Sequence, residues 1–270
     1  MKKSRLRLVY LLLITFLTWL PILIGVIYSF NASKLSSVWG GFSFKWYEKL
    51  FRDRSMRTAF VNSVVLAASS SLLAAAISLP AALAFRRPGL PFEKMTKSVL
   101  MLPIMVPDII LGMAFLAFFR LLRFPFGMLT LVIAHTSFSI PYIYRQVATR
   151  LAGMNTAVID ASRVLGAGPI RTFFEVTLPY LFPAVLSGAV LSFAMSFDDV
   201  IISVFVTGAN VNTLPIKVYT QVKTGMTPEV NALCAVMLLV ALTGVTVSGV
   251  IKRKMNRPQR ENESGQLQIK

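Results

Sequence analysis

The chain has 270 residues, of which 55% are hydrophobic and only 14% are charged, whereas soluble domains carry roughly a quarter charged residues. This composition excludes an ordinary soluble domain and indicates a membrane protein. The formal net charge is +17, but the basic residues lie in short connectors between apolar runs, which is typical of membrane topology and not of nucleic-acid binding. A single cysteine, Cys234, excludes a disulfide or a cysteine-based metal cluster within the chain.

Six apolar segments are long enough to cross a hydrocarbon layer about 30 Å thick as helices of about 20 residues. The first is longer than the apolar region of a signal peptide, and no clear cleavage site follows it, so we expect it to be retained. We therefore predict an all-α, polytopic helix bundle over residues 1–251, followed by a basic, polar tail over 252–270. The predicted spans are 8–28, 59–85, 98–119, 126–144, 181–206 and 230–251.

The distribution of basic residues predicts the orientation of these spans. An even number of crossings places both termini on one side, which receives 18 of the 28 Lys and Arg residues, against ten on the other side. Because cytoplasmic loops are enriched in basic residues, we expect both termini and the loop over 145–180 to be cytoplasmic. The basic residues of the N-terminal side lie in 1–7, 86–97, 145–171 and 252–270.

The first outer loop, 29–58, interleaves aromatic and polar residues. It is interpreted as an interfacial helix at headgroup level, as a docking surface for an external partner, or as both. The second span is rich in Ala and Ser, which let membrane helices approach closely, so we expect it to be central in the bundle. The aromatic residues of the loop are Trp39, Phe42, Phe44, Trp46, Tyr47 and Phe51.

Two later spans contain polar residues. In the third, Pro103 and Pro107 precede Asp108 and predict a broken helix, which is tolerated only where it is buried in protein or lines a cavity. In the fourth, His135 is favoured as an interhelical hydrogen-bonding residue over a role in a proton relay.

The loop between the fourth and fifth spans predicts two short helices. Asn155 or Thr156 can cap a helix whose apolar positions recur at helical spacing up to Leu165. Gly166 is expected to end that helix, and Pro169 suits the first position of a second one. We expect Leu178-Pro179 to stop the second helix.

This loop carries a resemblance. The spacing from Asp160-Ala161-Ser162 through Gly166 to Val176-x-Leu178-Pro179 resembles the EAA–G–I-x-L-P loop of ABC-transporter permeases, with Asp, Ser and Val as mild departures. The resemblance implies that 150–179 is a coupling loop seated on a cytoplasmic ATPase; an ordinary interfacial helix pair is the alternative. The coupling residues it implies are Asp160, Ala161, Ser162, Arg163, Gly166, Leu178 and Pro179.

The chain contains no GxxxxGK[ST] phosphate-binding loop, so a separate subunit is expected to hydrolyse ATP. We therefore expect a non-catalytic transport subunit that holds no cofactor and no metal, with ATP and Mg bound by the partner ATPase.

Adjacent acids, Asp198 and Asp199, lie in the apolar fifth span, and Asp108 opens part of the third. An intramembrane Asp costs several kcal/mol unless it faces a cavity or a partner, so these three residues are candidates for a substrate path. A structural hydrogen bond or a helix break is the alternative for the pair. A path lined by carboxylates would repel anions and favour an organic cation or a metal ion.

The stretch 192–232, together with GFSFKWYEKLF and LPIMVPDIILG, resembles the second permease subunit of spermidine/putrescine importers. This resemblance implies a bacterial inner-membrane subunit that carries polyamines and works with a second homologous permease, two copies of an ABC ATPase and an external, periplasmic binding protein. The loop over 207–229 is then a receiver of the binding protein or a simple connector. Alternatives are an importer of another cation, such as thiamine or ferric iron, a gradient-driven transporter or channel for small cations, and an assembly scaffold.

Overall fold

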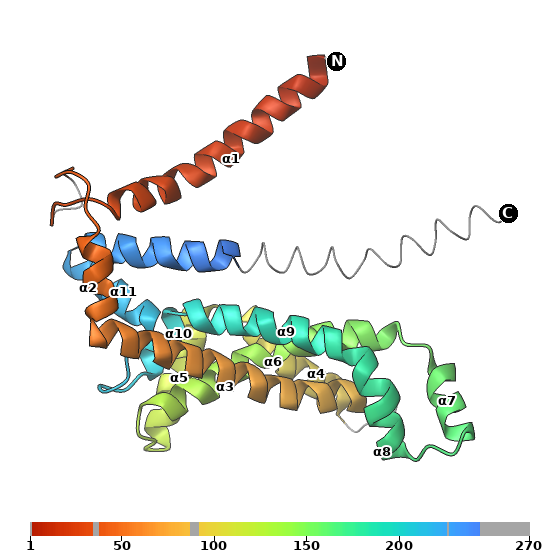
Figure 1. Cartoon of the computed structure of the whole chain (residues 1–270). Helices are drawn as coiled ribbons and strands as arrows, with labels where there is room; N and C mark the ends of the chain where they lie inside the picture. The colour runs from red at the N-terminus through yellow and green to blue at the C-terminus, as the bar shows by residue number, and fades with distance from the viewer. Residues whose placement is uncertain (1, 35–37, 87–91, 226, 244–270) are drawn as a thin grey trace. The chain divides into compact units, whose positions relative to one another are not determined.

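The computed structural model describes residues 2–34, 38–86, 92–225 and 227–243. Within them the chain is helical apart from turns, loops and one isolated bridge between Asn31 and Phe42. The chain divides into two compact units, residues 1–54 with 221–270 and residues 55–220. Figure 1 shows the helices coloured along the chain. The predicted all-α class is confirmed.

In the first unit, α1 (Lys2–Tyr28) exposes apolar side chains on nearly every side, as expected of a helix that contacts lipid. The segment after it folds around Asn31, whose side chain accepts from the backbone N–H of Gly40 at 2.8 Å and donates to the carbonyl of Val38 at 2.7 Å. The short helix α2 (Lys45–Arg52) follows and buries Trp46, whose indole N–H donates to the Asn31 carbonyl at 2.7 Å. The aromatic loop is therefore a folded element with an amphipathic helix.

Each of the six predicted spans overlaps helical structure in the described residues, but the count of six crossings is not confirmed, because not all of these helices could cross a membrane as they stand. Three are long and apolar enough, Arg7–Tyr28, Arg54–Ala84 and Pro169–Asp198, and a fourth crossing is possible if the bent pair of α4 (Glu93–Met105) and α5 (Asp108–Leu121) counts as one. The helix over Pro228–Thr243 covers the start of the predicted sixth span. The remainder of that span and the tail over 252–270 lie outside the described residues.

The second unit is built around α6 (Met128–Ala152), which packs against α4, α5, α9 (Leu178–Asp198) and α10 (Ile201–Val206). The contact between α6 and α9 is close: a Cβ atom on Gly188 would lie 3.0 Å from the Cα atom of Ile143. α3 (Arg54–Ala84) buries small side chains at helical spacing, and its Ser78 hydroxyl donates to the Ile140 carbonyl of α6 at 2.9 Å. Its predicted central position in the bundle stays a prediction, because α3 makes few backbone contacts with the other helices of the unit.

The third predicted span is broken as expected, but only at Pro107, since Pro103 lies inside α4. α4 ends at Met105, α5 begins at Asp108, and the two axes differ in direction by 113°. Pro107 removes a backbone donor and disfavours helical backbone at the residue before it, and Val106 accordingly has extended backbone with ψ 131°.

The helix pair predicted between the fourth and fifth spans is confirmed at its start and at its turn. α7 (Thr156–Val164) is capped by the Asn155 side chain, which accepts from the Ala157 N–H at 2.9 Å. Gly166 then adopts φ +86°, and α8 (Pro169–Thr172) begins at Pro169.

The predicted stop at Leu178-Pro179 is wrong. The chain stays helical from α8 through the π-helical turn η1 (Phe173–Thr177) into α9, where Pro179 occupies the first turn. The N–H of Leu178 bonds to the carbonyl of Phe173 five residues earlier. This wider turn lets the helix pass a proline that would otherwise clash with the carbonyl four residues before it.

The predicted fifth span is also not one helix. α9 ends at Asp198, Asp199 has extended backbone with ψ 128°, and α10 begins at Ile201. The helix break that was one of two interpretations of the acid pair is confirmed.

Candidate functional site

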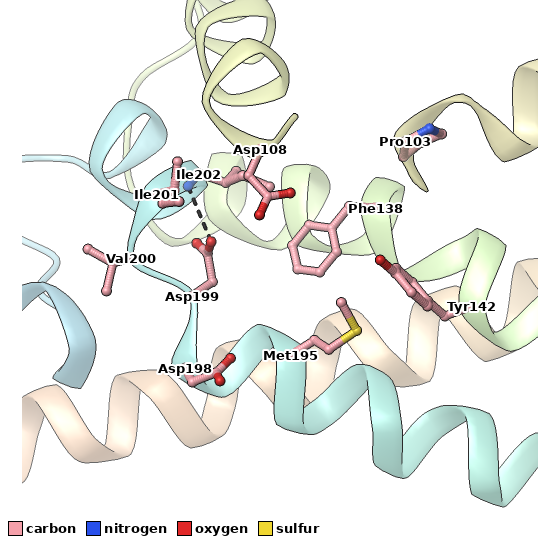
Figure 2. Close-up of a pocket in the computed structure, with 10 residues that line it drawn as sticks. All are labelled: Pro103, Asp108, Phe138, Tyr142, Met195, Asp198, Asp199, Val200, Ile201 and Ile202. Carbon is pink, nitrogen blue, oxygen red and sulfur yellow. Dashed lines mark hydrogen bonds between the residues drawn. The ribbon is translucent and has the colours of Figure 1, made fainter. Parts of the chain in front are cut away.

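The three acids of the predicted spans meet at one pocket of the second unit. Asp108 is the first residue of α5, Asp198 is the last of α9, and Asp199 lies in the break before α10. The pocket has a volume of about 430 Å³, within the range of small-molecule sites. Its lining, drawn in Figure 2, consists of Pro103, Asp108, Phe138, Tyr142, Met195, Asp198, Asp199, Val200, Ile201 and Ile202.

The local folding of two broken helices brings these carboxylates together. Asp108 lies in the first turn of α5, and Asp199 lies two residues before the start of α10; at both helix starts, free backbone N–H groups favour negative charge. Asp198 lies at the opposite kind of helix end, where unpaired carbonyls leave partial negative charge. Of the three carboxylates, Asp198 is therefore the one whose negative charge the helix backbone stabilises least.

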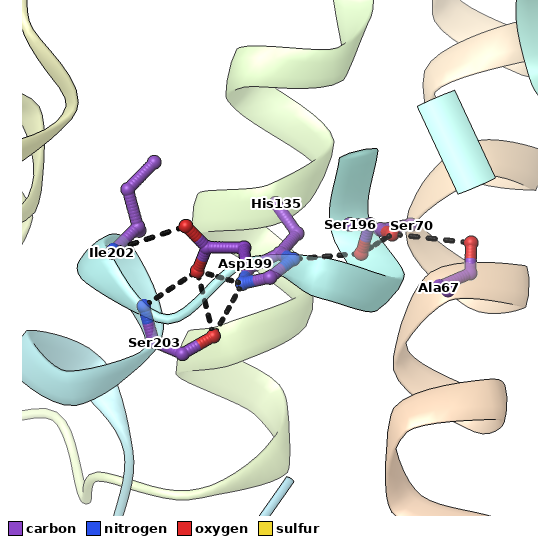
Figure 3. A network of polar contacts seen from close by, with 7 residues as sticks. All are labelled: Ala67, Ser70, His135, Ser196, Asp199, Ile202 and Ser203. Carbon is purple, nitrogen blue, oxygen red and sulfur yellow. Dashed lines mark hydrogen bonds and ion pairs between the residues drawn. The ribbon is translucent and has the colours of Figure 1, made fainter. Parts of the chain in front are cut away.

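Asp199 is held by hydrogen bonds from its surroundings. Its Oδ1 accepts from the N–H of Ile202 at 3.2 Å, and its Oδ2 accepts from the N–H and the hydroxyl of Ser203, both at 2.8 Å. The Nε2 atom of His135 lies 3.4 Å from the same Oδ2. Figure 3 shows these contacts converging on one carboxylate. The Asp199 side chain is 10% exposed, and because it accepts from two N–H groups of the first turn of α10 it satisfies the start of that helix.

Asp108 and Asp198 are different. Both carboxylates are exposed, and among the described residues neither is paired with another side chain by a hydrogen bond or an ion pair. No Lys or Arg lines the pocket among the described residues. Two carboxylates without a side-chain partner therefore face a cavity that offers them no compensating positive charge.

The other side of the pocket is apolar and aromatic. Phe138 and Tyr142 lie one turn apart on α6, and Met195 reaches the pocket from α9. In Figure 2 these three side chains lie opposite the carboxylates. Aromatic faces attract ammonium groups and accommodate methylene chains, so the pocket combines charge with an apolar surface. The described residues contain no group of three or more His, Cys, Asp and Glu arranged to hold a metal ion.

The predicted coupling residues lie elsewhere in the same unit. Asp160 and Arg163 are exposed neighbours on α7, 4.0 Å apart, and the Ser162 hydroxyl pairs with that of Thr172 on α8 at 2.7 Å. Val164 and Leu165 are each 87% exposed, so the end of α7 presents apolar surface. Ala161 lies on α7, Gly166 forms the turn that follows it, and Leu178 and Pro179 begin α9.

Comparison with known proteins decides the family. The model of the family described as binding-protein-dependent transport system inner membrane component matches residues 74–259. The chain belongs to this family. This inner membrane component is 35% identical over 256 residues to the spermidine/putrescine transport system permease protein PotC of Haemophilus influenzae, over 95% of the chain and 100% of the relative. It is 39% identical over 245 residues to the putrescine transport system permease protein PotI of Escherichia coli, over 87% of the chain and 86% of the relative.

Solved structures agree on the fold of this inner membrane component. It superposes on a chain of a bacterial ABC transporter that imports the polysaccharide alginate with a TM-score of 0.71 and 13% identity, over 93% of this chain and 95% of the other. For a chain of the inward-facing MetNI methionine ABC transporter the TM-score is 0.59 and the identity 20%, over 73% and 95%. The resemblance to ABC-transporter permeases found in the sequence is thus confirmed.

The sequence did not reveal the link between His135 and Asp199. Both residues were noticed for their polarity inside apolar spans, but their separation along the chain hides their contact. The signal available was the number of unpaired polar groups in the spans: a buried His and a buried Asp without other partners favour each other.

Proposed function

We propose that this inner membrane component is the permease subunit of an ATP-driven importer of polyamines, and that the acid pocket forms part of the translocation path. One observation carries the proposal: Asp108 and Asp198, which no other side chain pairs with, share a cavity with an aromatic wall. The described lining of this cavity contains no Lys or Arg. The PotC and PotI relatives are named for spermidine and putrescine transport, which supports the same substrate class.

The chemistry of a polyamine matches this pocket. Its ammonium groups are separated by methylene chains, so two of them can approach Asp108 and Asp198 on different helices while the chain between them lies on Phe138 and Tyr142. An anion would be repelled by the same carboxylates. Because each carboxylate stands alone, binding stays weak enough for the substrate to leave, which transport requires.

Energy for the cycle comes from a separate subunit in this proposal. The loop over 150–179 docks on an ABC ATPase, present in two copies, that binds ATP and Mg, and the exposed Val164 and Leu165 supply apolar contact area. A second homologous permease completes the path, and an external binding protein delivers the polyamine. Both termini lie on the cytoplasmic side of the bacterial inner membrane, and the chain itself catalyses no reaction.

Charge-neutralising variants test the role of the pocket. Asp198→Asn and Asp108→Asn each remove one cation contact, and a hydrogen bond to a charged group contributes about 1.5–3 kcal/mol, so we expect KM for putrescine uptake to rise about tenfold or more. Glu93→Gln is the matched control, because it removes one negative charge from α4 at a surface ion pair with Lys97.

The assay is uptake of labelled putrescine by cells that express the complete transporter, with complex assembly checked by co-purification. The control is expected to keep the wild-type KM. An Asp108→Asn/Asp198→Asn double variant with wild-type KM would contradict the proposed path.

A gradient-driven transporter would use the same acids but would need no ATPase. The exposed apolar end of α7 favours the importer, since a solvent-exposed apolar helix end next to a glycine turn is typical of a docking surface. Polyamine uptake by this chain in vesicles that contain no ATPase would rule the importer out.

A further inference from the structure

His135 bridges the two halves of the broken helix. It lies on α6 with 0% of its side chain exposed, and its ring reaches α9 with one nitrogen and α10 with the other. Nδ1 is 2.7 Å from the Ser196 hydroxyl, and Nε2 is 3.0 Å from the Ser203 hydroxyl. The Ser196 hydroxyl continues to that of Ser70 on α3 at 3.1 Å. Figure 3 shows this row of contacts across four helices.

The network assigns a proton to Nε2. The single hydroxyl hydrogen of Ser203 is directed to the Asp199 carboxylate at 2.8 Å, the stronger acceptor, so the Ser203 oxygen must accept from the imidazole. The same Nε2–H also points toward Asp199 Oδ2 at 3.4 Å. His135 therefore acts as a donor toward the α10 side of the break.

Few other side chains define this joint. Only Asp199 and Val200 separate α9 from α10, and the hydrogen bonds of Asp199 go to α10 and to His135. Because Asp198 directly precedes Asp199, any rotation of the joint changes the direction in which the Asp198 carboxylate points. The rigid imidazole ring fixes the distance between the Ser196 side and the Ser203 side of the joint.

We infer that His135 is the positioning residue of the acid pocket: acting through Asp199, it fixes the joint between α9 and α10 and so aims Asp198 at the substrate. Asp199 is then part of the support, and Asp108 and Asp198 are the carboxylates that meet the cation. This assignment rests on the proposed function for its substrate, but the contact between His135 and Asp199 does not.

Two replacements of His135 distinguish the contact made by its Nε2 atom from the contact made by its Nδ1 atom. In His135→Gln the side-chain amide can take the place of Nε2 and still donate to Ser203 and Asp199. In His135→Asn the shorter side chain brings its amide only to the place of Nδ1, near Ser196. We expect His135→Asn to raise KM for putrescine about tenfold and His135→Gln to stay within about threefold of wild type, since one charge-assisted hydrogen bond is lost only in the first.

The control is Ser78→Ala, which removes a partly buried hydrogen bond between α3 and α6 outside the pocket lining. It is expected to leave KM unchanged. A purely structural histidine would lower the amount of complex in both variants without separating their KM values, and equal KM values for Asn and Gln would overturn the inference.

A double-mutant cycle tests the path through Asp199. If His135 acts through Asp199, adding His135→Asn to Asp199→Asn changes KM little further, because the two residues share one function. If the fold-increases in KM of the two single variants multiply in the double variant, His135 does not act through Asp199.

The same cycle, measured as the thermal midpoint of the purified complex, tests the contact without any substrate. If the wild-type transporter carries no polyamine, the proposed function fails. The His135–Asp199 contact is then supported if the shifts in thermal midpoint of the two single variants do not add up to that of the double variant, and it is refuted if they do.

Discussion

Gly188→Ala should destabilise the contact between α6 and α9, which holds the two sides of the acid pocket. The added Cβ would lie 3.0 Å from the Cα atom of Ile143 and 3.3 Å from its Cγ2 atom. Ordinary contacts of this kind are about 3.5–4.0 Å, so the helices must separate by a few tenths of an ångström. Because the nearest atom belongs to the backbone, no rotamer change relieves the overlap. Overpacking of this kind costs about 1–3 kcal/mol.

Gly25→Ala in α1 is the matched control, because nothing lies within 4 Å of its added Cβ. Both variants gain the same helix propensity, about 1 kcal/mol in a helix interior, so their difference isolates the overlap. For a chain of this length 1 kcal/mol shifts the thermal midpoint by about 2–4 °C, so Gly188→Ala should unfold several degrees below Gly25→Ala. Equal midpoints in purified protein would refute the close packing.

Two further variants test the coupling loop and the first unit. Gly166→Ala places a side chain at φ +86°, which costs about 1–2 kcal/mol, and should reduce the stimulation of ATPase activity by loaded binding protein. Gly168→Ala, at φ −68°, is its control, and equal stimulation would contradict the role of the turn. Trp46→Phe removes the donor to the buried Asn31 carbonyl and should lower stability by about 1–3 kcal/mol, as measured by thermal unfolding. The exposed Trp39→Phe should change it little, and an equal loss would argue against the Trp46 hydrogen bond.

The acids of the pocket could be identified in the sequence, but their convergence on one pocket could not be predicted from it. Asp108, Asp198 and Asp199 stood out because ionised groups are rare in apolar spans, a signal that is local in the chain. Their convergence depends on the packing of α5, α9 and α10, and the role of Asp199 depends on His135 in another helix. In the sequence the two adjacent acids are equivalent, whereas in the structure Asp199 is held by hydrogen bonds and Asp198 is exposed to the pocket.

Helix boundaries were predictable where a single residue decides them. The Asn155 cap and the turn at Gly166 follow from local chemistry, and both are found. The helix end predicted at Pro179 is not found, because the effect of a proline depends on the turn before it. The π-helical turn over Phe173–Thr177 accommodates the proline ring, and the helix continues. Pro107 predicted a break, but a proline does not by itself predict the size of the change of direction, which is 113°.

ATP-driven uptake of labelled putrescine into vesicles that contain the complete transporter tests the central claim most directly. We expect uptake by the wild-type chain, no uptake without the ATPase, and a KM raised about 100-fold or more in the Asp108→Asn/Asp198→Asn variant, because two charge-assisted contacts are lost. Wild-type KM in that double variant, with the complex intact, would contradict a path that recognises its substrate through these two carboxylates.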